Sequence, residues 1–264
     1  MLFDINTTIG HWPFRQVPHE SPSELRALLR AKGITGAAVA HTHGLFYLNC
    51  HDANLELAQA ISGHTGFFVG VATLNPMYAA WERDLPACRE KLGLRALRLA
   101  PQYHGYQLGC PESLAIARAA AELALPVLVP HRVVDVRGRH WFDTEETVGF
   151  AHIAAFCEAV PETKVIVTEG SFDADLVLTK DGSFCCPNLY LELSRARDGL
   201  CNLPAAIAAE RMLFGSGAPL KSISPALLKL ELADADELGK QQIAWGNAHK
   251  LLGLDSGRPT PQGL

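Results

Sequence analysis

Several features that mark other classes of protein are missing from this sequence. No stretch reaches the roughly 20 consecutive apolar residues that a membrane-spanning helix needs. No basic segment precedes a long apolar run near Met1, so we expect no secretory signal peptide. The seven cysteines contain no C-x-x-C pair, which argues against a zinc knuckle and a disulfide framework. Reduced thiols in a cytoplasmic protein are the simplest expectation.

Basic charge is also scarce. The formal net charge is −5 and charged residues make up 19% of the chain, which disfavours nucleic acid or an anionic membrane as the main partner. Apolar residues, by contrast, make up 48% of the 264 residues. A chain of this length and composition can bury a large core without disulfides.

Short apolar runs alternate with longer amphipathic stretches from end to end. We expect strands at Leu2–Ile5, Ile34–Ala40, Phe67–Ala72, Leu94–Leu99, Pro126–Pro130, Lys164–Thr168, Leu189–Leu193 and Met212–Phe214. We expect helices at Ser23–Ala31, Asp52–Ile61, Tyr78–Leu92, Glu112–Ala124, Glu145–Val160, Phe172–Leu178, Leu203–Glu210, Pro225–Leu232 and Asp234–Leu252. This α/β alternation predicts a parallel (β/α)8 TIM barrel. Residues 1–254 would form this single domain, and residues 255–264 a flexible C-terminal tail.

A doubly wound sheet is the alternative fold. It usually carries a glycine-rich turn after its first strand, but residues 6–10 read N-T-T-I-G and hold no G-x-G-x-x-G. In a barrel, the active site lies at the C-terminal ends of the strands. Polar residues at those ends are Asp4, Asn6, Thr8, His41, His43, Asn75, Arg98, Gln102, His131, Arg132, Asp135, Glu169, Glu192, Ser194, Arg195, Ser216 and Lys221.

A series of local phrases follows this alternation in order. They read FDINTTIG, GVATLNP, GLRALRLAP, LPVLVPHR, KVIVTEG, MLFGSGAP and WGNAHKLLGL. Together they resemble the amidohydrolase superfamily, in particular its amidohydrolase family 2 branch of metal-dependent barrel hydrolases and decarboxylases. The resemblance runs to Leu254 and implies a barrel of amidohydrolase type.

The resemblance also implies metal ligands that this chain lacks. The family pattern D-x-H-x-H would place histidines where Asn6 and Thr8 stand, and it would place a histidine at Glu169 and an aspartate at Gly217. Of the expected groups, His131 alone remains. A catalytic zinc usually keeps three protein ligands, and neutral amides and hydroxyls bind it poorly. We therefore expect zinc, manganese or iron to be absent or held at low occupancy.

His131 and Glu169 are the candidate catalytic residues. Adjacent strands bring their ends together, so these two side chains would form a metal-free acid–base pair, with the carboxylate raising the pKa of the imidazole. The alternative is that they only satisfy each other in a polar pocket.

Two arginines are candidates for substrate binding. Arg98 and Arg132 would bind a substrate carboxylate, and Asn6, Thr8 and Glu192 would complete the binding site. For Arg98 the alternative is a structural ion pair with Glu169 or Glu192.

Replacement metal ligands are a further possibility. His41 and His43 lie two residues apart on an extended segment and share a face, which is a metal-ligand spacing. His11 follows the first strand and, with His131 and Glu169, completes the set of possible ligands. The loop Arg132–Asp143 would serve as a lid or contact a second subunit in a homodimer.

Two functions remain open. The first is a divergent amidohydrolase-like hydrolase acting on a small carboxylated lactone or amide, as the resemblance to lactonases without a tightly bound metal implies. The second is a catalytically inactive barrel that binds a small anionic ligand or a partner protein. Ionisable residues at most strand ends favour the enzyme, because an inactive mouth could fill with apolar side chains.

Overall fold

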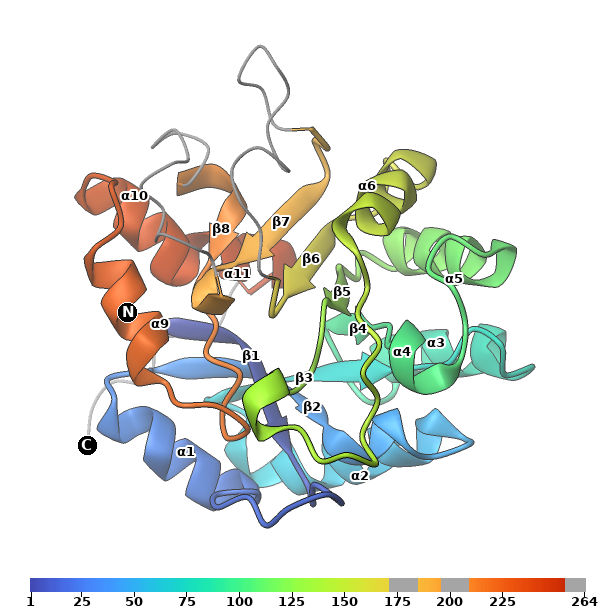
Figure 1. Ribbon diagram of the computed structural model, residues 1–264, viewed down its shortest axis with the longest axis horizontal. Coiled ribbons are helices and arrows are strands. Elements are labelled where there is room, and N and C mark those ends of the chain that lie inside the picture. Colours follow the sequence, from blue (N-terminus) through green and yellow to red (C-terminus); the bar gives the residue numbers. More distant parts are fainter. Residues whose placement is uncertain (171–184, 196–208, 255–264) are drawn as a thin grey trace.

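Eight parallel strands form one sheet that closes into a barrel, in a computed structural model that describes residues 1–170, 185–195 and 209–254 (Figure 1). The strands, in sheet order, are β1 Phe3–Ile9, β2 Gly36–His41, β3 Phe68–Thr73, β4 Ala96–Arg98, β5 Val127–Pro130, β6 Val165–Thr168, β7 Leu189–Glu192 and β8 Met212–Leu213. The Ile5 N–H donates to the Phe214 carbonyl at 2.9 Å, and Thr7 bridges Ala218, so β1 meets the end of β8. The predicted (β/α)8 barrel is confirmed.

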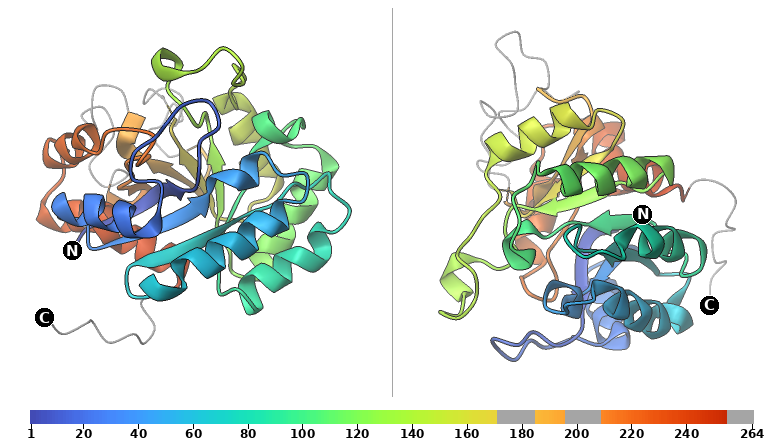
Figure 2. Two further views of the ribbon diagram at one scale, coloured as in Figure 1. Left: turned by 90° about the horizontal axis from the view of Figure 1, so that it is seen from below. Right: turned by 90° about the vertical axis from the view of Figure 1, so that its right-hand side faces the viewer.

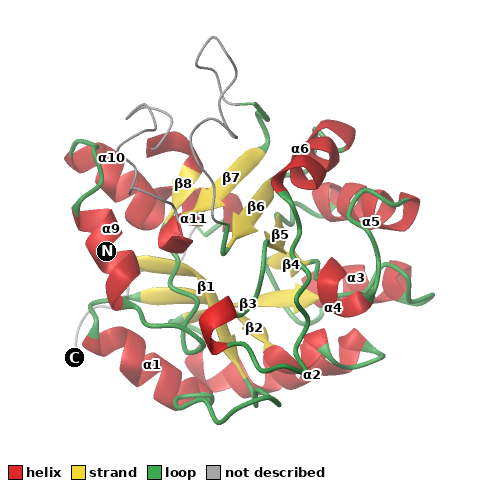
Figure 3. Cartoon of the chain, viewed as in Figure 1, coloured by secondary structure: helices red, strands yellow, loops and turns green. Residues whose placement is uncertain are grey.

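The helices lie on the outside of the barrel (Figures 2 and 3). They are α1 Pro22–Ala31, α2 Cys50–Ile61, α3 Trp81–Glu90, α4 Pro101–His104, α5 Pro111–Glu122, α6 Phe150–Ala159, α9 Ser224–Glu231, α10 Glu237–Gln241 and α11 Asn247–Leu252. The start of α1 is fixed by Ser21, whose side chain accepts from the Glu24 N–H in a capping box. No helix in the described part of the chain is both long and apolar enough to cross a membrane.

Some predicted helices differ from those observed. The segment predicted as one helix over Asp234–Leu252 contains a π-helical turn, Gln242–Gly246, between α10 and α11. A Cβ at Gly246 would overlap the amide end of the Gln242 side chain. The predicted helix Phe172–Leu178, almost all of Leu203–Glu210 and the tail 255–264 lie outside the described residues.

Two apolar layers hold the barrel. One cluster takes residues from every strand, including Ile5, Ala38, Val71 and Leu128, and therefore fills the barrel interior. The larger cluster joins the strands to the helices. The layers reflect the two faces of a strand, since Ala38 belongs to the inner cluster and its neighbours on β2 to the outer one.

The first strand is longer than predicted. It continues through Asn6 to Ile9, where Thr7, Thr8 and Ile9 pair with Val39, Ala40 and His41 after a register shift. These β-branched residues extend the ladder with β2. Asn6 and Thr8 therefore lie on the strand rather than after it, as the sequence had suggested.

An apolar cap covers the C-terminal ends of the strands. It consists of Trp12, Val17, Leu45, Ala100 and Val134, with Phe14, Tyr103, Val133 and Leu220 packed against them. These residues come from the loops after β1, β2, β4, β5 and β8. Figure 2 shows the loops after β1 and β5 rising on the same side of the barrel. Any site at the strand ends therefore lies beneath this cap.

Candidate active site

A small cavity opens at the strand ends beneath the apolar cap. Its polar lining comprises Asn6, Thr7, Thr8, Arg98, Thr168 and Glu169. Val133 and Leu220 of the cap also line it. The cavity offers about 30 Å³ to the centres of water molecules, which is room for about two of them.

Glu169 is the carboxylate that lines this cavity. Its side chain is buried, and its Oε1 accepts a hydrogen bond from Asn6 Nδ2 at 2.9 Å. Its Oε2 contacts the ammonium of Lys221. The backbone of Glu169 has φ 61°, a left-handed conformation that costs a residue with a side chain about 1–3 kcal/mol. Such strain persists only where the surroundings hold it, and here the Glu169 N–H donates to Glu192 Oε2 at 3.0 Å.

Lys221 is brought to Glu169 by the turn after β8. Its backbone N–H donates to the Gly217 carbonyl at 3.1 Å, which folds the chain back over the mouth. Burial lowers the pKa of the Lys221 ammonium, the carboxylate of Asp135 opposes that shift, and the charge of Arg132 adds to it. Contact with Glu169 favours the charged form of both partners.

Gly217 stands where the resemblance implies an aspartate. A Cβ at this position would overlap the Oε1 of Glu169 and press on the Lys221 side chain. Its φ of 72° is also a conformation that favours glycine. Glu169 and Lys221 thus occupy the space that the aspartate side chain would need.

The mouth does not fit the divalent metal that the resemblance implies. Asn6 and Thr8 are neutral donors, and Gly217 offers none. The carboxylate of Glu169 is already in contact with an ammonium, whose positive charge repels a metal ion. These residues provide a carboxylate–ammonium pair in place of a metal centre.

Two more carboxylates lie buried behind the cavity. Asp4 accepts from the Ser216 N–H at 3.0 Å and the Ser216 hydroxyl at 2.5 Å, and burial raises its pKa to about 7 against these hydrogen bonds. Burial likewise raises the pKa of Glu192 to about 7, although hydrogen bonds from Ser194 oppose the shift. Glu192 supports the backbone of Glu169, and its contact with substrate stays a prediction.

Arg98 presents a buried guanidinium to the cavity. Its Nε donates to Thr73 Oγ1 at 3.0 Å and its Nη2 to the His41 carbonyl at 2.7 Å. Burial lowers its pKa to about 10, so the group stays charged at neutral pH. Among the described residues, no ion pair joins Arg98 to Glu169 or Glu192, so the structural ion pair considered from the sequence is not observed.

The residues after β5 turn in other directions. His131 Nδ1–H donates to the Val148 carbonyl at 2.8 Å, which fixes the orientation of the ring. The His131 backbone N–H donates to the Thr168 carbonyl at 2.9 Å, so the ends of β5 and β6 are neighbours. A direct pair between His131 and Glu169 stays a prediction. Arg132 lines a second cavity with Gln102, Tyr103, Arg139 and Asp143.

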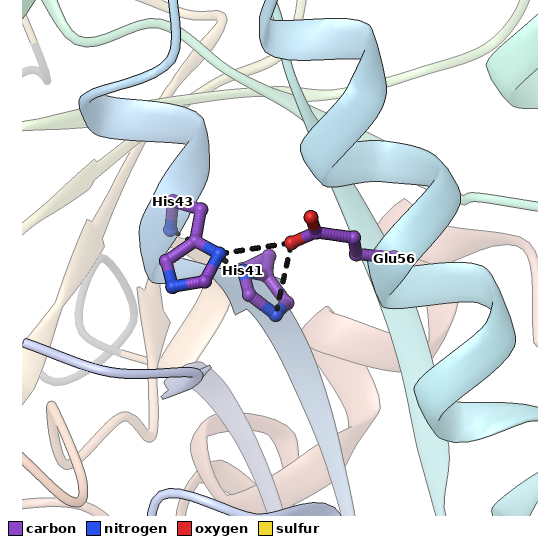
Figure 4. Close-up of side chains that lie close together, drawn as sticks. All are labelled: His41, His43 and Glu56. Carbon is purple, nitrogen blue, oxygen red and sulfur yellow. Dashed lines mark hydrogen bonds and ion pairs between the residues drawn. The ribbon is translucent and has the colours of Figure 1, made fainter.

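The other three histidines predicted as possible metal ligands, His11, His41 and His43, fall into two places. His11 is exposed, with its Nδ1 3.5 Å from Glu20 Oε2. His41 and His43 face Glu56 instead, with His43 Nδ1 2.9 Å and His41 Nε2 3.9 Å from Glu56 Oε2 (Figure 4). Burial and the neighbouring His43 lower the pKa of His41 to about 4, against the opposing charge of Glu56.

Sequence reasoning missed two of these residues. Lys221 was recognised as a strand-end residue but received no role, because its partner Glu169 lies 52 positions away. Glu56 was missed because it belongs to α2, whose orientation toward β2 is a property of the fold. The H-x-H spacing was the only signal for that cluster.

Comparisons with known proteins agree with the fold. A family model described as amidohydrolase matches residues 10–254. No curated protein matches the sequence significantly.

Three solved structures illustrate the likeness. The 2,6-dihydroxybenzoate decarboxylase from Rhizobium has a TM-score of 0.69 and 15% identity, with 96% of this chain and 98% of that chain covered. A dihydroxybenzoic acid decarboxylase from Polaromonas, with bound manganese and the inhibitor 2-nitroresorcinol, has a TM-score of 0.68 and 17% identity. The match covers 97% of this chain and 98% of that chain. A "probable 2-pyrone-4,6-dicarboxylic acid hydrolase" from Acinetobacter baumannii, with citric acid bound, has a TM-score of 0.60 and 13% identity. The match covers 96% of this chain and 99% of that chain. At these identities the likeness establishes the fold alone.

Proposed function

We propose, from the premise that this chain belongs to the amidohydrolase family, that it hydrolyses a small carboxylated lactone or amide without a metal at the barrel mouth. One observation carries the proposal. The buried carboxylate of Glu169 is held between the Asn6 amide and the Lys221 ammonium, at the edge of a cavity that also contains Arg98. A carboxylate and a cation at the strand ends are the parts that metal-free hydrolysis needs.

The proposed chemistry assigns each group one task. The Glu169 carboxylate takes a proton from water, and the water oxygen forms a bond to the substrate carbonyl carbon. The Lys221 ammonium stabilises the negative charge on the carbonyl oxygen, a contribution of about 10²–10³ in rate when such a donor is well placed. The bond from carbon to the ring oxygen or nitrogen then breaks, and the leaving atom takes up the proton. His131 is the second group that we propose carries this proton.

Arg98 defines the substrate class. Its guanidinium is charged, lines the cavity and is held by Thr73 and the His41 carbonyl in a fixed orientation. A preorganised guanidinium of this kind binds a carboxylate well. The decarboxylases and the hydrolase of similar fold are named for carboxylated substrates, which supports a small anionic substrate here.

A second candidate function is an inactive barrel that binds an anionic ligand. The apolar cap favours it, because Trp12 is buried over the mouth and the cavity beneath holds only about two water molecules. Such a protein would bind carboxylates through Arg98 without converting them.

Turnover of a defined panel separates the two functions. The panel consists of carboxylated lactones, beginning with 2-pyrone-4,6-dicarboxylate, and hydrolysis is followed by proton release. Wild-type protein should hydrolyse at least one member, and Glu169→Gln should abolish that activity. Glu20→Gln, which alters an exposed carboxylate beside His11, is the matched control and should behave as wild type. Binding of a panel member without turnover would instead support the inactive barrel.

A further inference from the structure

We propose that His41, His43 and Glu56 bind a zinc-type divalent metal ion at the end of β2, apart from the barrel mouth. The cluster is built from three separate elements, namely β2, the 3₁₀ turn Thr42–Leu45 and helix α2. One ligand atom from each residue lies within 4.8 Å of the other two. Figure 4 shows a ring nitrogen of His41 and one of His43 facing the same carboxylate oxygen of Glu56.

The spacing of these atoms suits a tetrahedral ion. Two ligands bound to zinc at about 2.0–2.1 Å lie about 3.3 Å from each other in tetrahedral geometry. Glu56 Oε2 is 2.9 Å from His43 Nδ1 and 3.9 Å from His41 Nε2, so the two distances bracket that value. The ligand atoms of all three residues lie within 4.8 Å of one another, so modest side-chain shifts are needed to complete the geometry.

The donor set selects the class of ion. Two imidazole nitrogens and one carboxylate oxygen are a ligand set found in catalytic zinc sites, which keep the fourth position open. Magnesium and calcium prefer oxygen ligands and would bind this set poorly. The cluster is reachable from solvent, since the side chains of His43 and Glu56 are 29% and 43% exposed.

Neighbouring groups hold the ligands in place. The Tyr47 hydroxyl donates to Glu56 Oε1 at 3.0 Å and lies 2.9 Å from His43 Nδ1, so it orients both groups as outer partners of metal sites do. An ion would take the place of the direct contact between His43 Nδ1 and Glu56 Oε2. Gly10 allows the His41 ring to pack against its backbone, because a Cβ there would overlap the ring. The His43 backbone N–H donates to His41 Nδ1 in a long hydrogen bond of 3.3 Å. Metal binding at Nε2 places the ring proton on Nδ1, so this hydrogen bond is then lost.

Calorimetric titration of the full chain with zinc chloride, after removal of metal by a chelator, tests this site. We expect one equivalent of zinc to bind and magnesium chloride to give no comparable binding. His43→Ala and Glu56→Gln should each weaken zinc binding by more than about 100-fold, because even changes around a metal site cost 10–100-fold. His11→Ala is the matched control, since His11 also faces one glutamate but has no third ligand beside it among the described residues. Its zinc affinity should equal that of wild type.

Three results would overturn the proposal. Each has a different consequence for the proposed hydrolase site at the barrel mouth. Absence of zinc binding to wild type would remove this site and leave the proposed hydrolase untouched. Unchanged zinc affinity in the His43→Ala, Glu56→Gln double variant, with loss in Cys186→Ser, would place the ion at the thiols of Cys185 and Cys186, 3.6 Å apart. Loss of zinc in His131→Ala instead would place it at the mouth and contradict the metal-free mechanism as well. Circular dichroism melting of each variant checks that it is folded.

Discussion

The carboxylate of Glu169 occupies the space that a side chain at Gly217 would need. The two residues lie on loops after β6 and β8, yet each determines what the other position can hold. Packing therefore couples the two positions at which the resemblance implies a histidine and an aspartate. The ammonium of Lys221 beside them completes an ion pair with Glu169 at the barrel mouth.

Substitution of Gly217 tests this coupling. Gly217→Ala should lower the free energy of unfolding by about 2–4 kcal/mol, because it combines a positive φ with overpacking against Glu169. Gly33→Ala is the matched control, since Gly33 has φ 78° but open space around it, and should cost only about 1 kcal/mol. In a Glu169→Ala background, Gly217→Ala should approach the Gly33 value in denaturant unfolding. Equal costs in both backgrounds would contradict the packing argument.

Removal of the Lys221 ammonium should impair catalysis more than folding. Lys221→Met keeps the volume of the side chain, and turnover of the active lactone should fall about 10²–10³-fold. The acid limb of the pH–rate profile should also move to higher pH, because Glu169 loses its neighbouring positive charge. Lys240→Met, which alters a half-buried lysine that does not line the cavity and donates to the Glu231 carbonyl, should change neither. An unchanged acid limb in Lys221→Met would show that Glu169 does not act with Lys221.

Arg98 should control affinity for the substrate carboxylate. Arg98→Lys keeps a positive charge but loses the fixed fork of donors, so KM should rise about 10–100-fold with a smaller change in kcat. Hydrolysis of a lactone without a carboxylate should be unaffected by the same change. A rise in KM for both substrates would assign Arg98 a structural role instead.

The buried carboxylate of Glu192 should make stability depend on pH. Its folded-state pKa is raised from 4.5 to about 7, so the folded state binds its proton more tightly than the unfolded state. Its contribution to stability is therefore complete below pH 4.5 and is lost as the pH rises toward 7. Between these values, urea unfolding of Glu192→Gln should show a weaker fall in stability than wild type does. Identical pH slopes would show that Glu192 is not buried as a proton-binding group.

His131 should have separable structural and catalytic roles. His131→Asn retains a donor for the Val148 carbonyl and removes Nε2, so its melting temperature should stay within a few degrees of wild type while turnover falls. His131→Ala removes both groups. Should His131→Asn hydrolyse the panel at the wild-type rate, Nε2 would have no part in proton transfer.

The sequence predicts the barrel better than it predicts the site. Runs such as Val127–Pro130 and Val165–Thr168 are β-branched and apolar, so their strands are recognisable from local composition alone. The end of β1 was misjudged because Asn6, Thr7 and Thr8 are polar, and only the position of β2 beside them makes them a strand. Contacts between side chains on separate loops or helices are harder still to predict from the sequence. Lys221 reaches Glu169 because of the turn at Gly217, and Glu56 meets His43 because α2 packs beside β2, neither of which leaves a local pattern.

The most direct test of the central claim is lactone turnover by chelator-treated protein. Wild-type protein, freed of metal and confirmed metal-free by plasma mass spectrometry, is assayed on the carboxylated panel before and after addition of zinc or manganese. The account predicts that activity survives chelation, is not raised by either metal and disappears in Glu169→Gln. Activity that vanishes on chelation and returns with metal would contradict it, and would place the chemistry on a bound ion instead of on Glu169 and Lys221.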